Sequence, residues 1–343
     1  MDAAPLADQI AALLDAAGVR SQRKLITSIL STGIELGQDG TDRLDLKIVS
    51  AALTEMRDAF RLFAPYEGVP KITVFGSART KEHDPLYRQA VDVASALADK
   101  GWMVVTGAGP GIMEAAAEGA GPDRSIGVSI RLPFEEKPNA LIEATEDRHV
   151  SMKYFFTRKL MLMKESAGFV SLPGGFGTLD ETFELLTLQQ TGKAEPVPIV
   201  LLDGTGGTFW AGLQQYVERE LAASGTINAD DFDRVLITDS VDAAVAEITG
   251  FWRNYDSLRW VDDTLVLRLR ERPTDVELGE LNERFAWLCA SGAIERTVPL
   301  RDEVRDDDKL DLARIVLHLD QHQVGELYRL IRAINALGSA PKK

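Results

Sequence analysis

Short apolar runs alternate with helical apolar stripes through the middle of this chain. Runs bounded by glycine or proline are typical of buried strands, and apolar residues spaced three or four apart are typical of one helix face. The predicted strands are 71–76, 102–106, 125–130, a short one near 149–150, 167–172, 197–202 and 234–238. The predicted helices are 85–100, one that begins at 112, 151–166, 178–190, 209–221 and 241–252.

This alternation predicts an α/β fold, a Rossmann-like doubly wound parallel sheet with helices on both faces. The first two strands run into small residues, Gly76-Ser77 and Gly107-Ala108-Gly109-Pro110-Gly111. Ligands of such open sheets bind outside the carboxyl ends of the strands. We therefore expect the functional site at that edge of the sheet.

The pattern changes on both sides of this region. The N-terminal part is predicted to be helical, with a break marked by Gly33, Gly37 and Gly40. Its two apolar stripes are Leu6, Ile10, Leu13 and Leu14, and then Ile48, Ala51, Leu53, Met56 and Phe60. The C-terminal part predicts a small α+β appendage, with strands 265–269 and 313–319 and helices 276–290 and 321–337. The expected domains are an N-terminal helical segment (1–66), a nucleotide-binding domain (67–254) and the appendage (255–343).

Two connecting stretches lack a periodic pattern. Residues 131–147, which include Pro133 and Pro138, predict a surface loop. The acidic stretch 301–308 predicts a solvated loop.

Composition narrows the possible functions. The chain has 343 residues and a net charge of −15, which argues against a nonspecific nucleic-acid binder or a binder of anionic membranes. One cysteine, Cys289, cannot form an intramolecular disulfide or a zinc cluster, and the four histidines show no metal-binding spacing. We therefore predict no metal. No basic-then-apolar leader and no run of membrane-spanning length is present, so a cytoplasmic location is expected.

The stretch Leu172-Pro173-Gly174-Gly175-Phe176-Gly177-Thr178-Leu179-Asp180-Glu181 lies between a predicted strand and a predicted helix. Glycines let backbone N–H groups approach an anion without interference from Cβ atoms, and a helix N-terminus attracts negative charge. These features indicate a phosphate cradle. A structural explanation also stands, because Thr178 and Glu181 match the T-x-x-E capping box.

A pair of basic residues, Arg158-Lys159, lies in the predicted helix before this loop. Such a pair is usually a solvated face. Here it is surrounded by apolar residues: Met152, Phe155, Phe156, Leu160, Met161 and Met163. This setting makes the pair a candidate for a functional role, and the same Met and Phe residues fit either core packing or a subunit contact.

The stretch from Pro173 to Glu181 resembles the P-G-G-x-G-T-x-x-E signature of the LOG ("lonely guy") family of nucleoside 5′-monophosphate phosphoribohydrolases, which includes the cytokinin-activating enzymes. The region around Arg158-Lys159 resembles the family's second motif, and 107–114 resembles its nucleotide loop. Gly76-Ser77 resembles the end of its first strand. The resemblance covers about residues 70–252. The additional segments at both ends are similar to the longer bacterial forms.

The resemblance implies a role for each matching residue. Glu181 is the expected catalytic carboxylate and Arg158 its cationic partner. The expected phosphate-binding residues are Gly174, Gly175, Gly177 and Thr178. The expected residues of the nucleotide site are Ser77, Gly109, Gly111, Met113, Glu114 and Lys159. The family is usually at least dimeric, which implies a homodimer or a larger homo-oligomer.

The chemistry of these residue types fits the implied reaction. Removing a base from ribose 5-phosphate passes through an oxocarbenium-like state that a carboxylate can stabilise, and a general base contributes about 10²–10⁴-fold. An arginine can stabilise the charge on the departing base. The scheme needs neither a metal nor an organic cofactor. The expected substrate is AMP or an N6-modified AMP.

Two other functions are kept as alternatives. A non-catalytic nucleotide sensor could use the same cradle. A pyridoxal-phosphate decarboxylase would need a Schiff-base lysine, and no motif surrounds Lys153, Lys159 or Lys164 to suggest one.

Overall fold

The computed structural model describes residues 5–131, 139–143, 146–228 and 231–342. The chain forms two compact units, Met1–Asp58 and Ala59–Lys343. The domain boundaries expected at 66/67 and 254/255 remain predictions. Most of the expected loop at 131–147, including Pro133 and Pro138, lies outside the described residues. Within it, Ala140–Glu143 forms a short helix, α6.

The first unit is helical. Its helices are α1 (Leu6–Ala16), α2 (Arg23–Gln38) and α3 (Arg43–Phe63), the last of which continues into the second unit. Gly33 and Gly37 lie inside α2, so the predicted break there is wrong. The chain turns only at Gly40, where φ is +69°. On α1, Ile10 and Leu14 are buried, but Leu13 is exposed.

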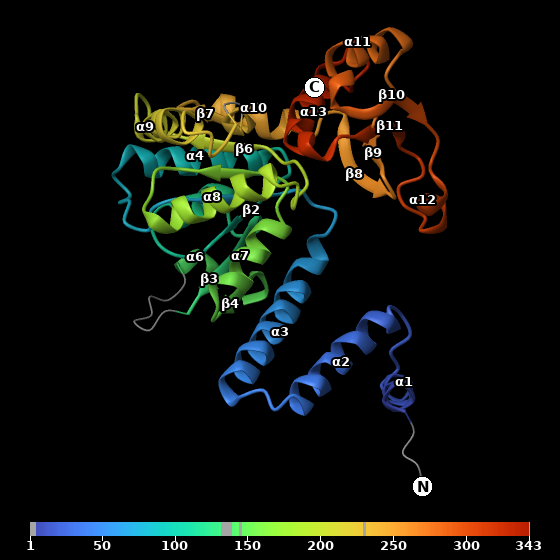
Figure 1. Ribbon diagram of the computed structural model, residues 1–343. Coiled ribbons are helices and arrows are strands. Elements are labelled where there is room, and N and C mark those ends of the chain that lie inside the picture. The colour runs from blue at the N-terminus through green and yellow to red at the C-terminus, as the bar shows by residue number, and fades with distance from the viewer. Residues whose placement is uncertain (1–4, 132–138, 144–145, 229–230, 343) are drawn as a thin grey trace. The chain divides into compact units, whose positions relative to one another are not determined.

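The second unit is built on a seven-stranded parallel sheet in the order β4-β3-β2-β1-β5-β6-β7 (Figure 1). Its strands are β1 (Lys71–Phe75), β2 (Met103–Thr106), β3 (Ser125–Ile130), β4 (His149–Met152), β5 (Phe169–Ser171), β6 (Ile199–Leu202) and β7 (Val235–Thr238). The predicted doubly wound sheet is therefore confirmed. Its order reverses between β1 and β5, which makes that point the expected crevice for a ligand.

Helices cover both faces of this sheet. They are α4 (Pro85–Asp99), α5 (Ile112–Ala120), α7 (Phe155–Lys164), α8 (Phe176–Gln190), α9 (Phe209–Tyr216) and α10 (Val241–Phe251). Ile72 and Val74 of β1 join the core formed with α4, α5 and α10. Thr73 points to the opposite face, where its hydroxyl donates to the carbonyl of Leu162 in α7. This alternation follows from the two-residue period of a strand.

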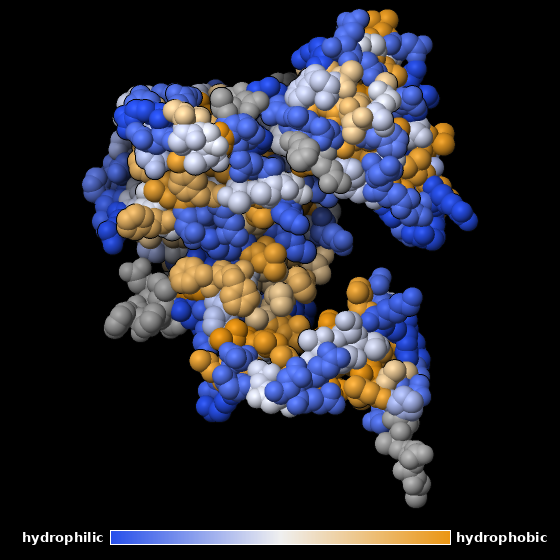
Figure 2. Space-filling model, viewed as in Figure 1, coloured by the Kyte–Doolittle hydropathy of each residue, from blue (hydrophilic) through white to orange (hydrophobic). Residues whose placement is uncertain are grey.

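The helix predicted at 151–166 is shorter than expected. Residues up to Met152 belong to strand β4, and α7 begins only at Phe155. Phe155, Phe156 and Leu160 are 57%, 55% and 46% exposed within one chain. Core packing is therefore the wrong explanation for these three side chains. Figure 2 shows an apolar patch over α7 on this face of the molecule.

A second, antiparallel sheet lies in the C-terminal part, in the order β10-β11-β9-β8. Its strands are β8 (Tyr255–Val261), β9 (Thr264–Leu269), β10 (Cys289–Thr297) and β11 (Ala313–Leu319). The helices α11 (Asp275–Phe285) and α13 (Leu327–Ala336) pack on one face and share its apolar core. The predicted helices 276–290 and 321–337 were too long, because 289–290 begin β10 and 321–326 form a 3₁₀ turn.

The acidic stretch 301–308 is not a solvated loop. Arg301–Arg305 forms α12, and Glu303 is fully buried against Arg268 and Arg314 on the second face of this sheet. Asp308 pairs with Arg268 as well, at 2.6 Å. Buried charges of this kind require partners, so the acidic residues of this stretch hold α12 on the sheet.

Candidate active site

Three glycine-containing loops meet at the carboxyl edge of the parallel sheet. They follow β1, β2 and β5, and the register places β2 and β5 on the two sides of β1. A Cβ at Gly174 would lie 3.1 Å from the backbone nitrogen of Ser77. A Cβ at Gly111, where φ is +69°, would overlap the carbonyl oxygen of Ser77. The loops are therefore packed backbone to backbone, which requires glycine at both positions.

The loop after β5 presents free backbone N–H groups. Helix α8 begins at Phe176, and the first intrahelical bond runs from the N–H of Leu179 to the carbonyl of Gly175, at 3.1 Å. The N–H groups that precede Leu179 in this helix have no intrahelical acceptor. Among the described residues, a Cβ at Gly175 or Gly177 would meet nothing within 4 Å beyond its chain neighbours and the backbone of its own helix. This open space in front of a helix N-terminus suits an anion.

The capping-box explanation for Glu181 is wrong. Gly175 is the N-cap of α8, and no side chain caps this end of the helix. Thr178 is the third helical residue, and a Cβ at Gly174 would overlap its hydroxyl oxygen. Thr178 therefore lies against the glycine loop, and Glu181 is left without a capping role.

The loop after β2 is held in a strained conformation. Ala108 has φ of +59°, a value that residues with a Cβ rarely adopt. Its N–H donates to the hydroxyl of Thr106 at 3.1 Å, and its carbonyl accepts from the N–H of Asn139 at 2.9 Å. The amide of Asn139 also donates to the carbonyl of Gly109, at 3.1 Å. Sequence reasoning missed Asn139, because it lies far along the chain in a stretch without a motif.

Arg158 is packed against the same loop. Its Nε donates to the carbonyl of Val128 in β3 at 3.0 Å, and a Cβ at Gly107 would overlap its Nη2. The sulfur of Met113 lies beside Gly107 as well. Burial lowers the pKa of the Arg158 guanidinium. Among the described residues no carboxylate forms an ion pair with Arg158, and its guanidinium is held by the Val128 carbonyl and by packing against Gly107.

Burial also changes the acidity of Glu181. Desolvation raises the pKa of this carboxyl to about 7, and the charges of Arg158 and Lys159 oppose the shift only in part. A carboxyl that titrates near neutral pH is a candidate general acid or base. The structure thus combines a partly desolvated carboxyl, a half-buried guanidinium and an open helix N-terminus.

Two ion pairs make Lys159 a poor candidate for a general acid or base. Its ammonium lies 2.8 Å from Asp180 and 2.5 Å from Glu184, which raises its pKa despite partial burial. Glu114 lies half-buried in the first turn of α5. The roles of Lys159, Glu114 and the other residues of the nucleotide site remain predictions.

Within the described residues, no group of three or more His, Cys, Asp or Glu side chains is arranged to hold a metal ion. No helix of the described chain has the length and apolarity needed to span a membrane.

The chain is similar to a family of known proteins over its parallel-sheet region. A family model described as "Possible lysine decarboxylase" matches residues 111–248. A cytokinin riboside 5′-monophosphate phosphoribohydrolase of Mycobacterium marinum is 29% identical over 172 residues, which are 49% of this chain and 88% of that protein. Proteins with the same printed name from Mycobacterium tuberculosis (29% identical, 49% and 88%) and Arabidopsis thaliana (28% identical, 43% and 69%) also match.

A solved structure, the molybdenum cofactor carrier protein of Chlamydomonas reinhardtii, covers 53% of this chain and 96% of its own. The two are 20% identical with a TM-score of 0.38, a likeness too low to say anything about a ligand. The family model includes the motif at 173–181 and the second half of the one at 107–114. The Rossmann-like part of this chain is therefore similar to the LOG family of phosphoribohydrolases.

Proposed function

We propose that this protein hydrolyses the N-glycosidic bond of a nucleoside 5′-monophosphate. The observation that supports this most directly is the half-buried carboxyl of Glu181, whose pKa desolvation raises to about 7, beside loops that leave space for an anion. The similar proteins that are named phosphoribohydrolases support the same class of reaction. AMP or an N6-modified AMP is the proposed substrate.

The proposed reaction breaks the bond between C1′ of the ribose and the ring nitrogen of the base. The C1′ atom passes through an oxocarbenium-like state, which the carboxylate of Glu181 stabilises. The water whose oxygen adds to C1′ gives a proton to Glu181, and the departing base, which keeps the electron pair of the broken bond, takes up a proton from solvent. Glu181 then releases its proton to solvent. The products are the free base and ribose 5-phosphate.

Arg158 and the glycine loop have complementary parts in this scheme. The guanidinium of Arg158 stabilises the negative charge that builds on the departing base, and it stays protonated throughout. The N–H groups at the start of α8, with Gly174, Gly175, Gly177 and Thr178 around them, bind the 5′-phosphate. This remote contact orients C1′ beside the carboxylate.

A direct assay tests the activity. Purified protein is incubated with AMP, N6-modified AMP, GMP, CMP and UMP, and the released bases are separated by chromatography. We expect base and ribose 5-phosphate in equal amounts from at least one purine monophosphate. Release from none of them would contradict the proposed hydrolysis.

A nucleotide sensor remains the alternative function. Glu181→Gln separates the two, because an enzyme should lose turnover and still bind the nucleotide. Glu184→Gln is the matched control, since Glu184 lies on the same helix and pairs with Lys159. A wild-type protein that binds AMP without cleaving it would favour the sensor.

The description of the matching family also raises lysine decarboxylation as a possible reaction. That chemistry needs a lysine that can become neutral and form a Schiff base. Lys159 is paired with two carboxylates and Lys164 with Glu165, and neither arrangement favours a neutral amine. These contacts support the hydrolase over the decarboxylase.

We further propose that the chain forms a homodimer or a larger homo-oligomer, and that it works in the cytoplasm. The exposed Phe155, Phe156 and Leu160 on α7 support a self-association surface. These residues line a hollow with Lys159 and Leu188.

A further inference from the structure

A single buried amide holds the loop that follows β2. Asn139 is 7% exposed and precedes the short helix α6. Its side-chain NH2 group donates to the carbonyl of Gly109 at 3.1 Å, and its backbone N–H donates to the carbonyl of Ala108 at 2.9 Å. Its side-chain oxygen accepts from the N–H of Ile142, at 3.1 Å. One of these side-chain partners can only accept and the other can only donate, so the orientation of the amide is fixed.

The loop needs this support because Ala108 is strained. A residue with a Cβ at φ of +59° costs free energy, and it persists only where the surrounding structure holds it. Strained residues of this kind concentrate at ligand-binding sites. Ala108 lies just beyond the carboxyl end of β2, at the edge where open parallel sheets bind their ligands. The strain and its support therefore belong to the candidate active site.

The two bonds to the loop also determine the direction of a free donor. The peptide between Ala108 and Gly109 is trans, so the N–H of Gly109 points away from the carbonyl that Asn139 binds. Among the described residues, this N–H has no hydrogen-bond acceptor. The next residue, Pro110, has no N–H. Asn139 therefore orients a backbone donor toward the side of the loop that is opposite to itself.

The loop is held from both faces of the parallel sheet. Asn139 lies on the side of α6, whose Ile142 packs with Ala117 of α5. Arg158 belongs to α7, which covers the opposite face, and its Nη2 occupies the space that a Cβ at Gly107 would take. Without the bonds from Asn139, the loop would be free to move relative to the guanidinium.

We propose that Asn139 is a positioning residue for nucleotide binding, which holds residues 107–109 so that the N–H of Gly109 donates to the bound nucleoside monophosphate. This role rests on the proposed function. Asn139 acts through the loop and does not touch the reacting bond, so it should govern affinity more than turnover. Arg158 keeps its own bond to the carbonyl of Val128, and Glu181 lies on α8.

Steady-state kinetics with AMP test this role. Asn139→Ala should raise KM about tenfold and lower kcat by less than about threefold. Asn139→Asp should raise KM similarly, because a carboxylate still accepts from the N–H of Ile142 but cannot donate to the carbonyl of Gly109. A wild-type KM for Asn139→Asp would mean that the amide serves only to cap α6. A merely structural role would reduce the amount of active protein, and so lower the apparent kcat at an unchanged KM.

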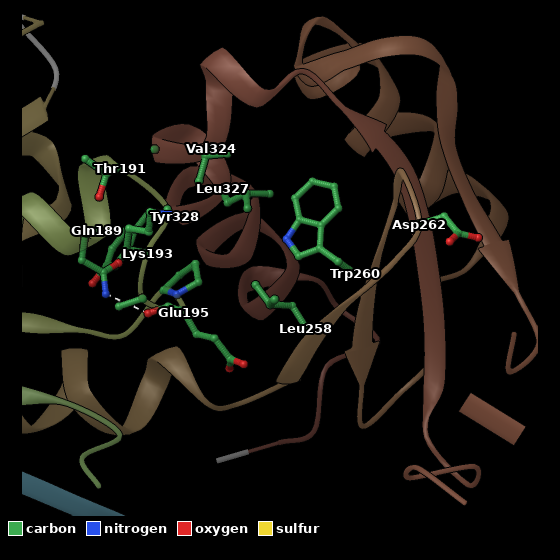
Figure 3. Close-up of a pocket in the computed structure, with 14 residues that line it drawn as sticks. Gln189, Thr191, Lys193, Glu195, Leu258, Trp260, Asp262, Val324, Leu327 and Tyr328 are labelled. Carbon is green, nitrogen blue, oxygen red and sulfur yellow. Dashed lines mark hydrogen bonds between the residues drawn. The ribbon is translucent and has the colours of Figure 1, made fainter. Parts of the chain in front are cut away.

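Gln189 provides matched controls at the opposite edge of the same sheet. It is 5% exposed, and its side-chain amide donates to the backbone carbonyl of Glu195 at 2.8 Å (Figure 3). The connection that it holds leads into β6 and therefore lies at the amino edge, away from the glycine loops. Gln189→Ala and Gln189→Glu remove the same kind of bond from a buried amide. Thermal melts should show a loss of stability like that of the Asn139 variants, whereas KM should stay unchanged.

Binding without turnover separates this proposal from the proposed hydrolysis. In proteins that also carry Glu181→Gln, Asn139→Ala should weaken AMP binding about tenfold by calorimetric titration. A protein that binds AMP without cleaving it would therefore still show the role of Asn139. Cleavage of AMP with the same KM in wild type and Asn139→Ala would overturn this role and leave the hydrolysis standing. A wild-type protein that binds none of the monophosphates would overturn both.

Discussion

At the scale of single residues, Glu181 is the group whose properties depend most on its surroundings. Desolvation raises its pKa to about 7, although Arg158 and Lys159 pull in the opposite direction. Two consequences can be measured, one on activity and one on stability.

The activity should depend on pH through Glu181. If the carboxylate is the reacting form, kcat/KM should rise about tenfold per pH unit below 7 and level off above it. Glu181→Gln should lower kcat by about 10²–10⁴-fold and remove this part of the profile. A profile that is flat between pH 5 and 8 would argue against Glu181 as the base.

Glu181 should make the stability of the fold depend on pH, with the opposite sign to the dependence that a salt-bridged carboxyl produces. The folded-state pKa of Glu181 lies above the unfolded value, so folding favours the protonated form, and this stability is lost as pH rises from 4.5 to 7. The shift corresponds to about 3 kcal/mol. Glu181→Gln should therefore gain stability relative to wild type at pH 8.5 and not at pH 4.5, as measured by thermal melts. Glu184→Gln removes only a smaller contribution to this shift and should show a much smaller gain.

At the scale of elements, the first turn of α8 contains a glycine, a residue that disfavours helices, and the space beside that glycine is open. Gly177 is the second residue of this helix, and among the described residues a Cβ there would meet nothing within 4 Å beyond its chain neighbours and the backbone of its own helix. A glycine in such a place lowers helix stability without a packing reason. The phosphate binding proposed for this loop would supply a functional reason.

Gly177→Ala should therefore separate stability from binding. Alanine favours a helix over glycine by up to about 1 kcal/mol, so the free protein should become slightly more stable. The added methyl group enters the space proposed for the phosphate, so KM for the monophosphate should rise. Denaturant titration and steady-state kinetics measure the two effects. A loss of stability with unchanged KM would contradict this reading of the loop.

Helix α7 has an apolar face that the single chain does not cover. Leu160→Glu should convert the proposed oligomer to monomers, because a charge at a buried contact is costly. Light scattering after size exclusion measures the mass. Val276→Glu, at a 72% exposed position on α11, is the control and should leave the mass unchanged. An unchanged mass for Leu160→Glu would mean that α7 is not the subunit contact.

At the scale of the whole molecule, one buried amide joins the two sheets of the second unit. Asn335 on α13 accepts hydrogen bonds from the N–H groups of Asn254 and Tyr255, at 2.7 and 2.9 Å, and donates to the carbonyl of Phe251. These residues form the connection from α10 to β8. Asn335 therefore fixes the point where the chain passes from the first sheet to the second.

Asn335→Leu should destabilise this unit by about 3 kcal/mol, since three buried backbone groups lose their partner. Chemical denaturation measures the loss. Asn282→Leu is a useful comparison, because its amide bridges α11 and β10 within the C-terminal part alone. If Asn335 couples the sheets, its substitution should also split the unfolding transition in two, whereas Asn282→Leu should keep a single transition.

Much of the fold could be predicted because buried parallel strands are continuous apolar runs and their helices carry regular stripes. Strands β8 and β10 were not predicted, because β8 is half-exposed and β10 is irregular, and neither has a continuous apolar run. Helix α12 was missed because its buried side is acidic, and Glu303 is buried only through Arg268 and Arg314. The helix after β4 was drawn too long because Met152 suits a strand and a helix equally well.

The sequence by itself determined the glycine loops, their place after β1, β2 and β5, and the candidate pair Glu181 and Arg158, since these follow from local motifs and residue chemistry. Only the tertiary structure decided that Gly175 caps α8, that Asn139 holds Ala108 and Gly109, and that burial brings the pKa of Glu181 to about 7. The physical reason is that desolvation and close packing depend on β3, α5 and α7, which are distant along the chain and adjacent only after folding.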